Sequence, residues 1–262
     1  MANRPLVPVS VEGLEDIAEA LLNSKKNGDG EEGSQSINTK VNIDRTQYIQ
    51  IPQKNVLIRK GEEHKGLNWE QTIYALGENG LYMPSPAIFM QHFMNVKNAS
   101  EGKFILYDGN NKPIDKPEAK DIWEYLTTGH RGGCWTWFDA FFKQDGNNPI
   151  YMETNHRVVG SGNSKKLSSK RVNLDSHVSE NSYVTLNFNK DGLLTAKSSL
   201  NKYKQGENIY FYSPVKDKVA RFYSNSGRAF LNCSGDPSVT DSSLGVFACA
   251  GGATAQKLRS IL

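Results

Sequence analysis

The chain has 262 residues, of which 37% are hydrophobic and 10% are aromatic. This composition is ordinary for a globular protein, and the length is enough for one large domain or two small ones, of which we expect one main core. The formal net charge of +3 creates no strong electrostatic field, so nucleic acid is not an expected partner.

The first 40 residues are expected to form an appendage. Their start, MANRPLVPVSVEGLEDIAEALL, has neither a basic n-region nor an uninterrupted apolar h-region, so no cleaved signal peptide is predicted. Residues 11–22 place apolar side chains on one helical stripe with acids opposite, which predicts a short amphipathic helix and an assembly contact. The Gly-, Ser- and charge-rich residues 23–40 predict a flexible linker, so the folded domain is expected at 41–262.

Three helices are predicted in the first half of that domain. Residues 67–76 form the first, with Asn68 at its N-cap. Residues 85–96 form the second, with Ser85 as the N-cap and a proline at the first helical position. Residues 116–129 form the third, which stops at a glycine. No apolar run approaches the roughly 20 residues of a membrane span, so membrane insertion is not expected.

Short runs with the alternation of strands lie mostly in the second half. They are residues 103–108, 134–142, 182–189, 208–213, 219–224, 228–233 and 244–249. Helices precede strands, and turn signals such as KDG, NSG and SGDP separate the strands. This order indicates an α+β domain of helices flanking short antiparallel strands, rather than a repeating βαβ fold.

The segment GHRGGCWTWFDAFF, residues 129–142, is the clearest candidate for catalysis. His130 lies four residues before Cys134, and a nucleophilic thiolate needs a base or a positive field. We favour a packed aromatic strand instead. Its alternation would turn Cys134, Thr136 and Phe138 to one face and Trp135, Trp137 and Asp139 to the other.

No metal ion or cofactor is predicted. The sequence contains neither C-x-x-C nor H-E-x-x-H, the tight spacings that bind zinc. Residues 160–164, GSGNS, lack the Lys-Ser/Thr pair of a phosphate loop and are interpreted as a turn. For Cys233 and Cys249, a disulfide and two buried free thiols both fit the sequence. Nothing at the level of motifs specifies an enzyme.

Residues 219–234 alternate in a way that predicts a recognition surface. The small or apolar residues expected to face inward are Ala220, Phe222, Ser224 and Ser226 before the NSG turn, and Ala229, Leu231 and Cys233 after it. Their outward neighbours are Arg221, Tyr223, Asn225, Arg228, Phe230, Asn232 and Ser234. Large anchors mixed with adaptable hydrogen-bonding groups are typical of binding surfaces, whereas a solvated strand more often carries Lys and Glu.

The same region has an unusual composition. Between Val219 and Ala255 there is no Lys, Glu, Gln, Met or Trp, although these types make up about a fifth of the chain. They are the types that a codon ending in a pyrimidine cannot encode. Diversification at the adenines of AAC or AAT codons would leave this absence.

With these features, VARFYSNSGRAFLNCSGDPSVTDSSLGVFACA resembles the C-terminal region of the variable proteins of diversity-generating retroelements, in which reverse transcription mutates adenines in a repeat. The family frame V-A-x-F, A-x-L-x-C, P-S and L-G-V is present. GGCWTWFDAFF is similar to the internal G-G-x-W-T-x-x-D-A segment of the family. The resemblance covers about residues 130–250, and archaeal and viral members, such as a variable protein of an archaeal virus, resemble the chain most.

The resemblance implies a C-type lectin-like fold that displays a variable region, about residues 219–247, to a protein or glycan on a cell or virion surface. The fixed frame would be Val219, Ala220, Phe222, Ala229, Leu231, Cys233, Pro237, Leu244, Gly245 and Val246. The diversified, ligand-binding positions would be Arg221, Tyr223, Asn225, Gly227, Arg228, Phe230, Asn232, Ser234, Gly235, Asp236, Val239 and Asp241.

The chain departs from relatives of that fold in two respects. The calcium signatures Glu-Pro-Asn and Trp-Asn-Asp are absent, so calcium-dependent sugar binding is not implied. Formylglycine-generating enzymes use paired cysteines, and Cys233 and Cys249, in or beside the variable region, would be poorly placed for that role. The alternatives to display are such an enzyme, a hydrolase using Cys134 and His130, or a structural virion component assembled through residues 11–22.

Overall fold

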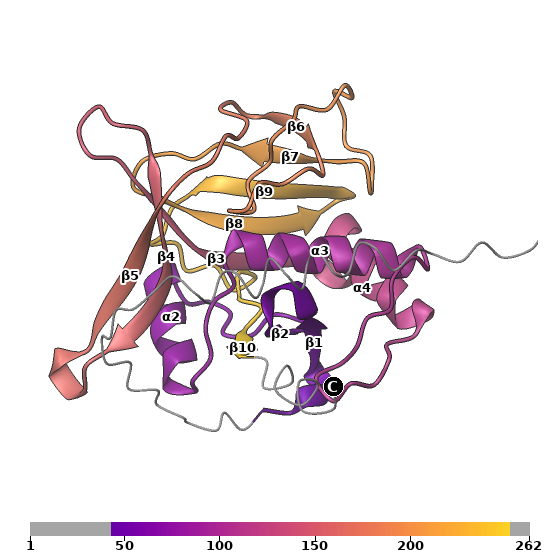
Figure 1. Cartoon of the computed structure of the whole chain (residues 1–262), viewed down its shortest axis with the longest axis horizontal. Helices are drawn as coiled ribbons and strands as arrows, with labels where there is room; N and C mark the ends of the chain where they lie inside the picture. The colour runs from indigo at the N-terminus through magenta and orange to yellow at the C-terminus, as the bar shows by residue number, and fades with distance from the viewer. Residues whose placement is uncertain (1–42, 252–262) are drawn as a thin grey trace, which may run out of the picture. The chain divides into compact units, whose positions relative to one another are not determined.

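Three helices and two sheets make up the part of the chain described by the computed structural model, residues 43–251 (Figure 1). The helices are α2 (Trp69–Glu78), α3 (Pro86–Ser100) and α4 (Lys116–Thr128). One sheet has three strands and the other has seven, so the α+β class predicted from the sequence is confirmed. The helix predicted at 11–22 and the linker at 23–40 lie outside the described residues.

Each helix begins within two residues of its predicted start, whereas α2 and α3 end two and four residues later than predicted. The side chain of Asn68 accepts a hydrogen bond from the N–H of Gln71, whose own side chain accepts from the N–H of Asn68, which completes a capping box. Ser85 caps α3 and Asp115 caps α4 in the same way, each through its side-chain oxygen. The chain leaves α4 through Gly129, whose φ of 80° is the left-handed conformation that glycine adopts readily.

The seven-stranded sheet has the order β5-β4-β3-β8-β9-β7-β6. Its members are β3 (Cys134–Lys143), β4 (Tyr151–Val159), β5 (Lys166–Asn173), β6 (Ser182–Thr185), β7 (Asn208–Tyr212), β8 (Lys218–Asn225) and β9 (Arg228–Gly235). The prediction of antiparallel strands is wrong for one pair, because β7 and β9 are parallel. After β7 the chain passes beyond the position of β9 to form β8, and the hairpin then returns β9 beside β7 in the same direction.

The small sheet has the order β1-β2-β10 and joins the two ends of the described chain. Its strands are β1 (Tyr48–Ile51), β2 (Val56–Arg59) and β10 (Cys249–Gly251). Two strand predictions are wrong here. Residues 103–108 and 244–248 make only isolated bridges, among them Ile49 with Asp108 and Glu63 with Val246.

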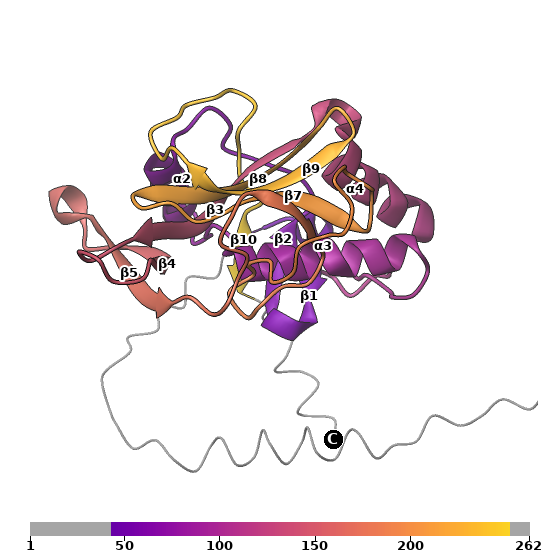
Figure 2. The same cartoon turned by 90° about the horizontal axis from the view of Figure 1, so that it is seen from above.

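The two faces of the large sheet are covered differently. Helices α3 and α4 lie side by side along one face (Figures 1 and 2), where Phe89 and Phe93 of α3 pack against Phe138 of β3 and Phe222 of β8. A second apolar cluster covers Trp137, on the opposite face of β3, with side chains of α2 and of residues 244–248. The remainder of that second face, across β8, β9, β7 and β6, carries half-buried side chains.

A histidine without polar partners lies in the main core. His92 on α3 is fully buried, and neither ring nitrogen has a hydrogen-bond partner among residues 43–251. Its ring packs against those of Phe89 and Phe247. Burial lowers the pKa of His92 to about 3, because the charged form would lose its hydration.

We expect this histidine to make the domain sensitive to acid. Below about pH 6.5 the unfolded chain takes up a proton at His92, whereas the folded protein does not until about pH 3, so stability falls as the pH drops through this window. The slope from this group is about 1.4 kcal/mol per pH unit. In His92→Leu, the slope of the free energy of unfolding against pH should be smaller by the contribution of one proton, about 1.4 kcal/mol per pH unit. Urea unfolding at several pH values measures this slope. Identical slopes in the two proteins would contradict the prediction.

Candidate functional site

The β8–β9 hairpin alternates largely as predicted. On β8, Ala220, Phe222 and Ser224 are buried, whereas Arg221, Tyr223 and Asn225 are half-buried. On β9, Ala229, Leu231 and Cys233 are buried, Phe230 and Ser234 are half-buried, and Arg228 is exposed. The predicted fixed frame is buried throughout, except for the half-buried Pro237.

The turn of this hairpin corrects one expectation. Ser226, predicted to face inward, is exposed and forms the two-residue loop with Gly227 between paired residues Asn225 and Arg228. The φ angles of Ser226 and Gly227 are 46° and 72°, as a type I′ turn requires. The alternation of β8 therefore ends at Asn225.

Two predicted ligand-binding positions are not accessible. Asn232 is 6% exposed, and its Oδ1 accepts hydrogen bonds from the N–H and the hydroxyl of Ser234. Gly235 is buried, and a Cβ there would lie 3.0 Å from the carbonyl oxygen of Val219 and 3.3 Å from Cδ of Arg221. The β8–β9 pairing shifts register between Val219 and Arg221, which disrupts the simple alternation at this end.

The loop after β9 is ordered by its own side chains. Asp236 and Asp241 are exposed, and each accepts hydrogen bonds through Oδ1 from the N–H and the hydroxyl of the serine two residues later. These bonds lower the pKa of both carboxyl groups. Val239 is half-buried against the second apolar cluster. The predicted polar contacts of this loop are thus already engaged locally, as in Asx turns.

None of the described helices covers the second face of the large sheet over β8, β9, β7 and β6, and we call this part the open face. A row of aromatic rings crosses it. Tyr223 is stacked between Trp135 of β3 and Phe230 of β9, with centroid distances of 4.8 and 4.5 Å and interplanar angles of 15° and 14°. The row continues from Phe230 to Tyr210 on β7 at 6.2 Å and from Tyr210 to Tyr183 on β6 at 5.0 Å. We call these five half-buried residues the aromatic row.

The sequence does not predict that Trp135, Tyr183, Tyr210 and Tyr212 belong to this face. Tyr212, two residues further along β7, packs against Tyr210 with a centroid distance of 5.0 Å. The alternation of tyrosines in NIYFYS is the signal for a shared face on β7, but the sheet order decides that the face lies beside β9.

The open face has a positive electrostatic character. Strands β6 to β9 contain no Asp or Glu, and among the described residues neither Arg221 nor Arg228 forms an ion pair. The guanidinium of Arg221 lies 5.9 Å from the ring centroid of Tyr223, and its Nε is buried without a hydrogen-bond partner. Burial, followed by the electrostatic interaction and the hydrogen bond with Tyr212, raises the pKa of Tyr223 to about 12. The hydroxyl group therefore remains protonated at neutral pH.

The hairpin tip approaches α4 and β3 at positions where only glycine fits. The N–H of Gly227 donates to the carbonyl of Thr128 at the end of α4. A Cβ on Gly129 would lie 2.9 Å from the nitrogen of Ser226, and a Cβ on Gly133 would lie 2.1 Å from the carbonyl oxygen of Ser224. The G-G-x-W-T segment thus holds the base on which the hairpin rests.

The L-G-V segment lies between β3 and residues 62–64. Gly245 donates its N–H to the carbonyl of Trp135 and accepts from the N–H of Trp137, while Val246 exchanges two hydrogen bonds with Glu63. A Cβ on Gly245 would lie 2.7 Å from the carbonyl oxygen of Glu63. This close packing supports the sheet beneath the open face.

The structure does not bring the predicted catalytic pair together for nucleophilic chemistry. Cys134 is fully buried, and burial together with the carboxylate of Glu62 raises the pKa of its thiol well above the usual value. His130 lies in a short, exposed 3-10 turn, where its Nε2 is 3.1 Å from Oδ1 of Asp121. Cys134 therefore remains a neutral thiol, which is the opposite of what a nucleophile needs.

The other two cysteines are free thiols, so of the two possibilities that fit the sequence, the disulfide is wrong and the pair of buried free thiols is confirmed. Cys233 and Cys249 are fully buried, and burial raises the pKa of both thiols. Within residues 43–251, no group of three or more His, Cys, Asp or Glu side chains is placed to hold a metal ion.

A buried carboxylate–histidine pair was not predicted from the sequence. Asp139 on β3 accepts a hydrogen bond from the backbone N–H of His156 on β4 at 3.0 Å and contacts Nδ1 of the same histidine. Both side chains are buried beneath Trp69 of α2, whose ring meets that of His156 edge-on at 4.9 Å. The pair joins β3 to β4 where the pairing of β4 with β5 shifts register.

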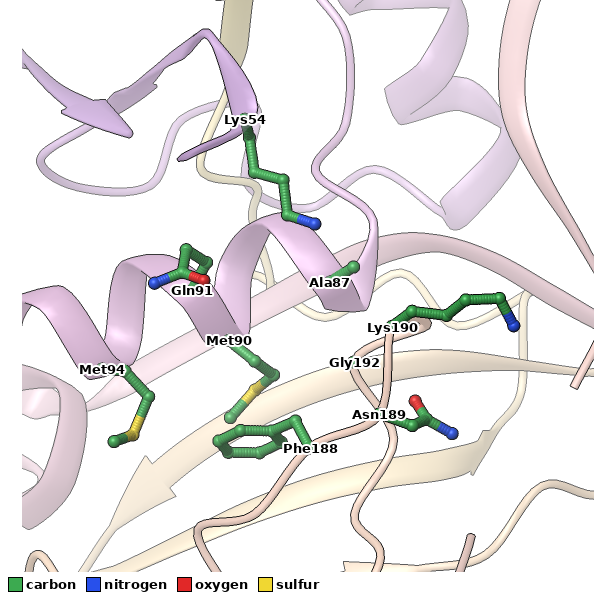
Figure 3. Close-up of a pocket in the computed structure, with 9 residues that line it drawn as sticks. All are labelled: Lys54, Ala87, Met90, Gln91, Met94, Phe188, Asn189, Lys190 and Gly192. Carbon is green, nitrogen blue, oxygen red and sulfur yellow. The ribbon is translucent and has the colours of Figure 1, made fainter. Parts of the chain in front are cut away.

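A pocket of about 310 Å³ lies between α3 and the loop around residues 188–192 (Figure 3). Met90, Met94 and Phe188 line its apolar part, and the polar lining consists of Lys54, Gln91, Asn189 and Lys190. Lys190 is paired with Asp175 and Asp191. The pocket contains none of the predicted variable positions, so it is separate from the open face.

The covered and the accessible positions of the predicted variable set should respond differently to mutation. We expect Asn232→Ala to lower the free energy of unfolding by about 1–2 kcal/mol, because Ser234 loses its acceptor inside a covered site. Arg228→Ala should leave stability unchanged, because the side chain is exposed and forms no ion pair among the described residues. Urea unfolding of both variants measures the difference, and equal losses would show that burial does not separate the two classes.

Comparisons with known proteins gave no match, either to a family model, to a curated protein or to a solved structure. In the described part of the chain, no helix has both the length and the apolarity needed to cross a membrane. The open face itself therefore carries the functional argument.

Proposed function

We propose that the chain is a ligand-binding display protein, which presents a variable surface on a rigid, C-type lectin-like scaffold. The observation that carries the proposal is the division of residues within one hairpin and its loop. The frame positions are buried apart from Pro237, whereas the variable positions are half-buried or exposed apart from Asn232 and Gly235. Apart from Gly227, whose φ of 72° favours glycine, substitutions on the accessible set cost little stability, so the surface can change while the fold is kept.

The chemistry of the accessible set supports recognition rather than simple solvation. Tyr223 and Phe230 are rigid aromatic anchors held by stacking, and Arg221 and Arg228 supply directional donors. Asn225 and Ser234 add smaller hydrogen-bonding groups beside them. A macromolecule on a cell or virion surface, protein or glycan, is the proposed ligand.

The C-type lectin-like scaffold is part of the same proposal. Two helices packed on one face of the sheet, a hairpin in its centre and the L-G-V segment against β3 are the features that support it. We attribute the rigidity of this scaffold to two places where backbones pack closely, Gly133 against Ser224 and Gly245 against Glu63.

The coding DNA tests the display function directly. We expect a near-repeat of the segment encoding about residues 219–247, next to a reverse transcriptase gene, that differs from the coding copy only where the repeat carries adenine. Codons at the twelve variable positions should end in a pyrimidine, and the frame codons, such as those of Ala229 and Leu231, should be identical in both copies. Purine-ending codons at the variable positions, or differences spread equally over the frame, would contradict the proposal.

A further inference from the structure

The open face continues beyond the variable region. The parallel pairing of β7 with β9 places Tyr210 opposite Phe230, and β6 places Tyr183 opposite Tyr210. In Figure 1 the strands β8, β9, β7 and β6 follow one another across the sheet. The half-buried tyrosines of β6 and β7 therefore extend the surface formed by Tyr223 and Phe230.

The rings of the aromatic row offer their edges and hydroxyl groups to a ligand, rather than their faces. Both faces of Tyr223 are covered, one by Trp135 and the other by Phe230. Tyr210 contacts three rings, those of Tyr183, Tyr212 and Phe230. Sugar rings and nucleobases bind aromatic side chains by lying on an open ring face, and Tyr223 has no such face available.

The groups that remain available are electropositive or donate hydrogen bonds. The edge of an aromatic ring carries partial positive charge, and tyrosine hydroxyl groups such as those of Tyr183 and Tyr210 can donate hydrogen bonds. The hydroxyl of Tyr223 is already bonded to Tyr212. Arg228 adds a full charge, and Arg221 adds one that is partly balanced by Asp241 of the loop after β9, whose pKa the arginine helps to lower. No acidic residue lies on β6 to β9 themselves. Such a face complements carboxylates and backbone carbonyl groups.

We propose that this face binds a protein surface with clustered carboxylates, and that Tyr183, Tyr210 and Tyr212 form a constant half of the site. The inference rests on the display function proposed above. The variable half, which includes Arg221, Tyr223, Arg228 and Phe230, selects the epitope, while the constant tyrosines supply contact area that every variant shares.

A random peptide display library and a glycan array, both applied to the full-length protein, test the inference. We expect the selected peptides to be enriched in Asp and Glu and the glycans to give no binding that depends on the face. Tyr210→Ala and Tyr183→Ala should each weaken peptide binding about 10-fold, the loss expected at an aromatic anchor, and Arg228→Glu should weaken it at least as much. Tyr107→Ala and Lys54→Glu are matched controls, because both residues are exposed and lie outside β6 to β9.

The outcomes separate the inference from the function on which it rests. If Arg228→Glu and Phe230→Ala abolish binding while Tyr210→Ala and Tyr183→Ala do not, the constant half is wrong and display stands. The inference of an acidic protein ligand would be contradicted if the selected peptides were neutral or basic. It would also be contradicted if only glycans bound, and did so through the variable residues. Failure of every probe to bind in a way that depends on Arg228 and Phe230 would remove the display function as well. Near-ultraviolet circular dichroism checks that each variant is folded.

Discussion

Gly133→Ala should destabilise the domain severely. The new Cβ would lie 2.1 Å from the carbonyl oxygen of Ser224, and both are attached to backbone in the centre of the sheet. Gly133 has a φ of 86° and a ψ of 163°, a conformation that essentially only glycine adopts. We expect the free energy of unfolding to fall by at least about 3 kcal/mol, because the clash adds to a conformational cost of about 1–3 kcal/mol.

Its neighbour Gly132 provides a matched control. Gly132 also has a positive φ, 92°, but a Cβ there would meet nothing within 4 Å. Gly132→Ala should therefore show the conformational cost alone, about 1–2 kcal/mol. Urea unfolding of the two variants measures the difference, and similar losses would mean that β3 and β8 separate easily at this point.

This close approach connects the scaffold to the display surface. Gly133 lets the start of β3 lie against β8, and two residues later Trp135 provides a constant ring on which Tyr223 stacks. The hydroxyl of Ser224 accepts from the N–H of Cys134 and donates to the carbonyl of Tyr125. In the proposed display function, the variable residue at position 223 is therefore positioned by a backbone that does not vary with it.

Local signals made the helices and the hairpin predictable. Caps at Asn68 and Ser85 and the stop at Gly129 act within a few residues of the helix ends, so the sequence alone contains their causes. The alternation of β8 is equally local, because the inward residues must be small or apolar wherever the strand packs.

Features that depend on the order of the strands were not predictable. The parallel β7–β9 pair depends on where β8 enters the sheet, and the aromatic row exists only because that pair brings Tyr210 beside Phe230. Strand β5 has mostly exposed side chains and lies at the sheet edge, so it lacks the apolar alternation that marks a strand.

The covered variable positions show a second limit of pattern reasoning. Simple alternation places Asn232 outward, and it does lie opposite Arg221, yet its side chain is covered and bonded to Ser234. Gly235 is buried against the stem of Arg221, so a larger residue there would displace that arginine. If the proposed display function holds, diversity at position 235 should therefore act on ligand binding through Arg221, whereas diversity at position 228 should act directly.

Asp139→Ala should produce the second large loss of stability. Asp139 was predicted only as one outward residue of an aromatic strand, but its carboxylate is buried and bonds both the ring and the backbone N–H of His156. Removal of the carboxylate leaves these groups without their acceptor inside the protein. We expect the free energy of unfolding to fall by about 3–5 kcal/mol, the usual cost of removing one partner from a buried pair.

Two further variants distinguish the causes of this loss. Asp139→Asn keeps an acceptor for the N–H of His156 but removes the charge, so its loss should be smaller than that of Asp139→Ala. Asp145→Ala removes an exposed carboxylate that pairs with Arg171 and should leave stability unchanged. A loss in Asp145→Ala equal to that in Asp139→Ala would show that burial does not determine the effect. If Asp139→Ala is as stable as the parent, α2 and β4 do not depend on the buried pair, and a water molecule accepts from His156 in place of the carboxylate.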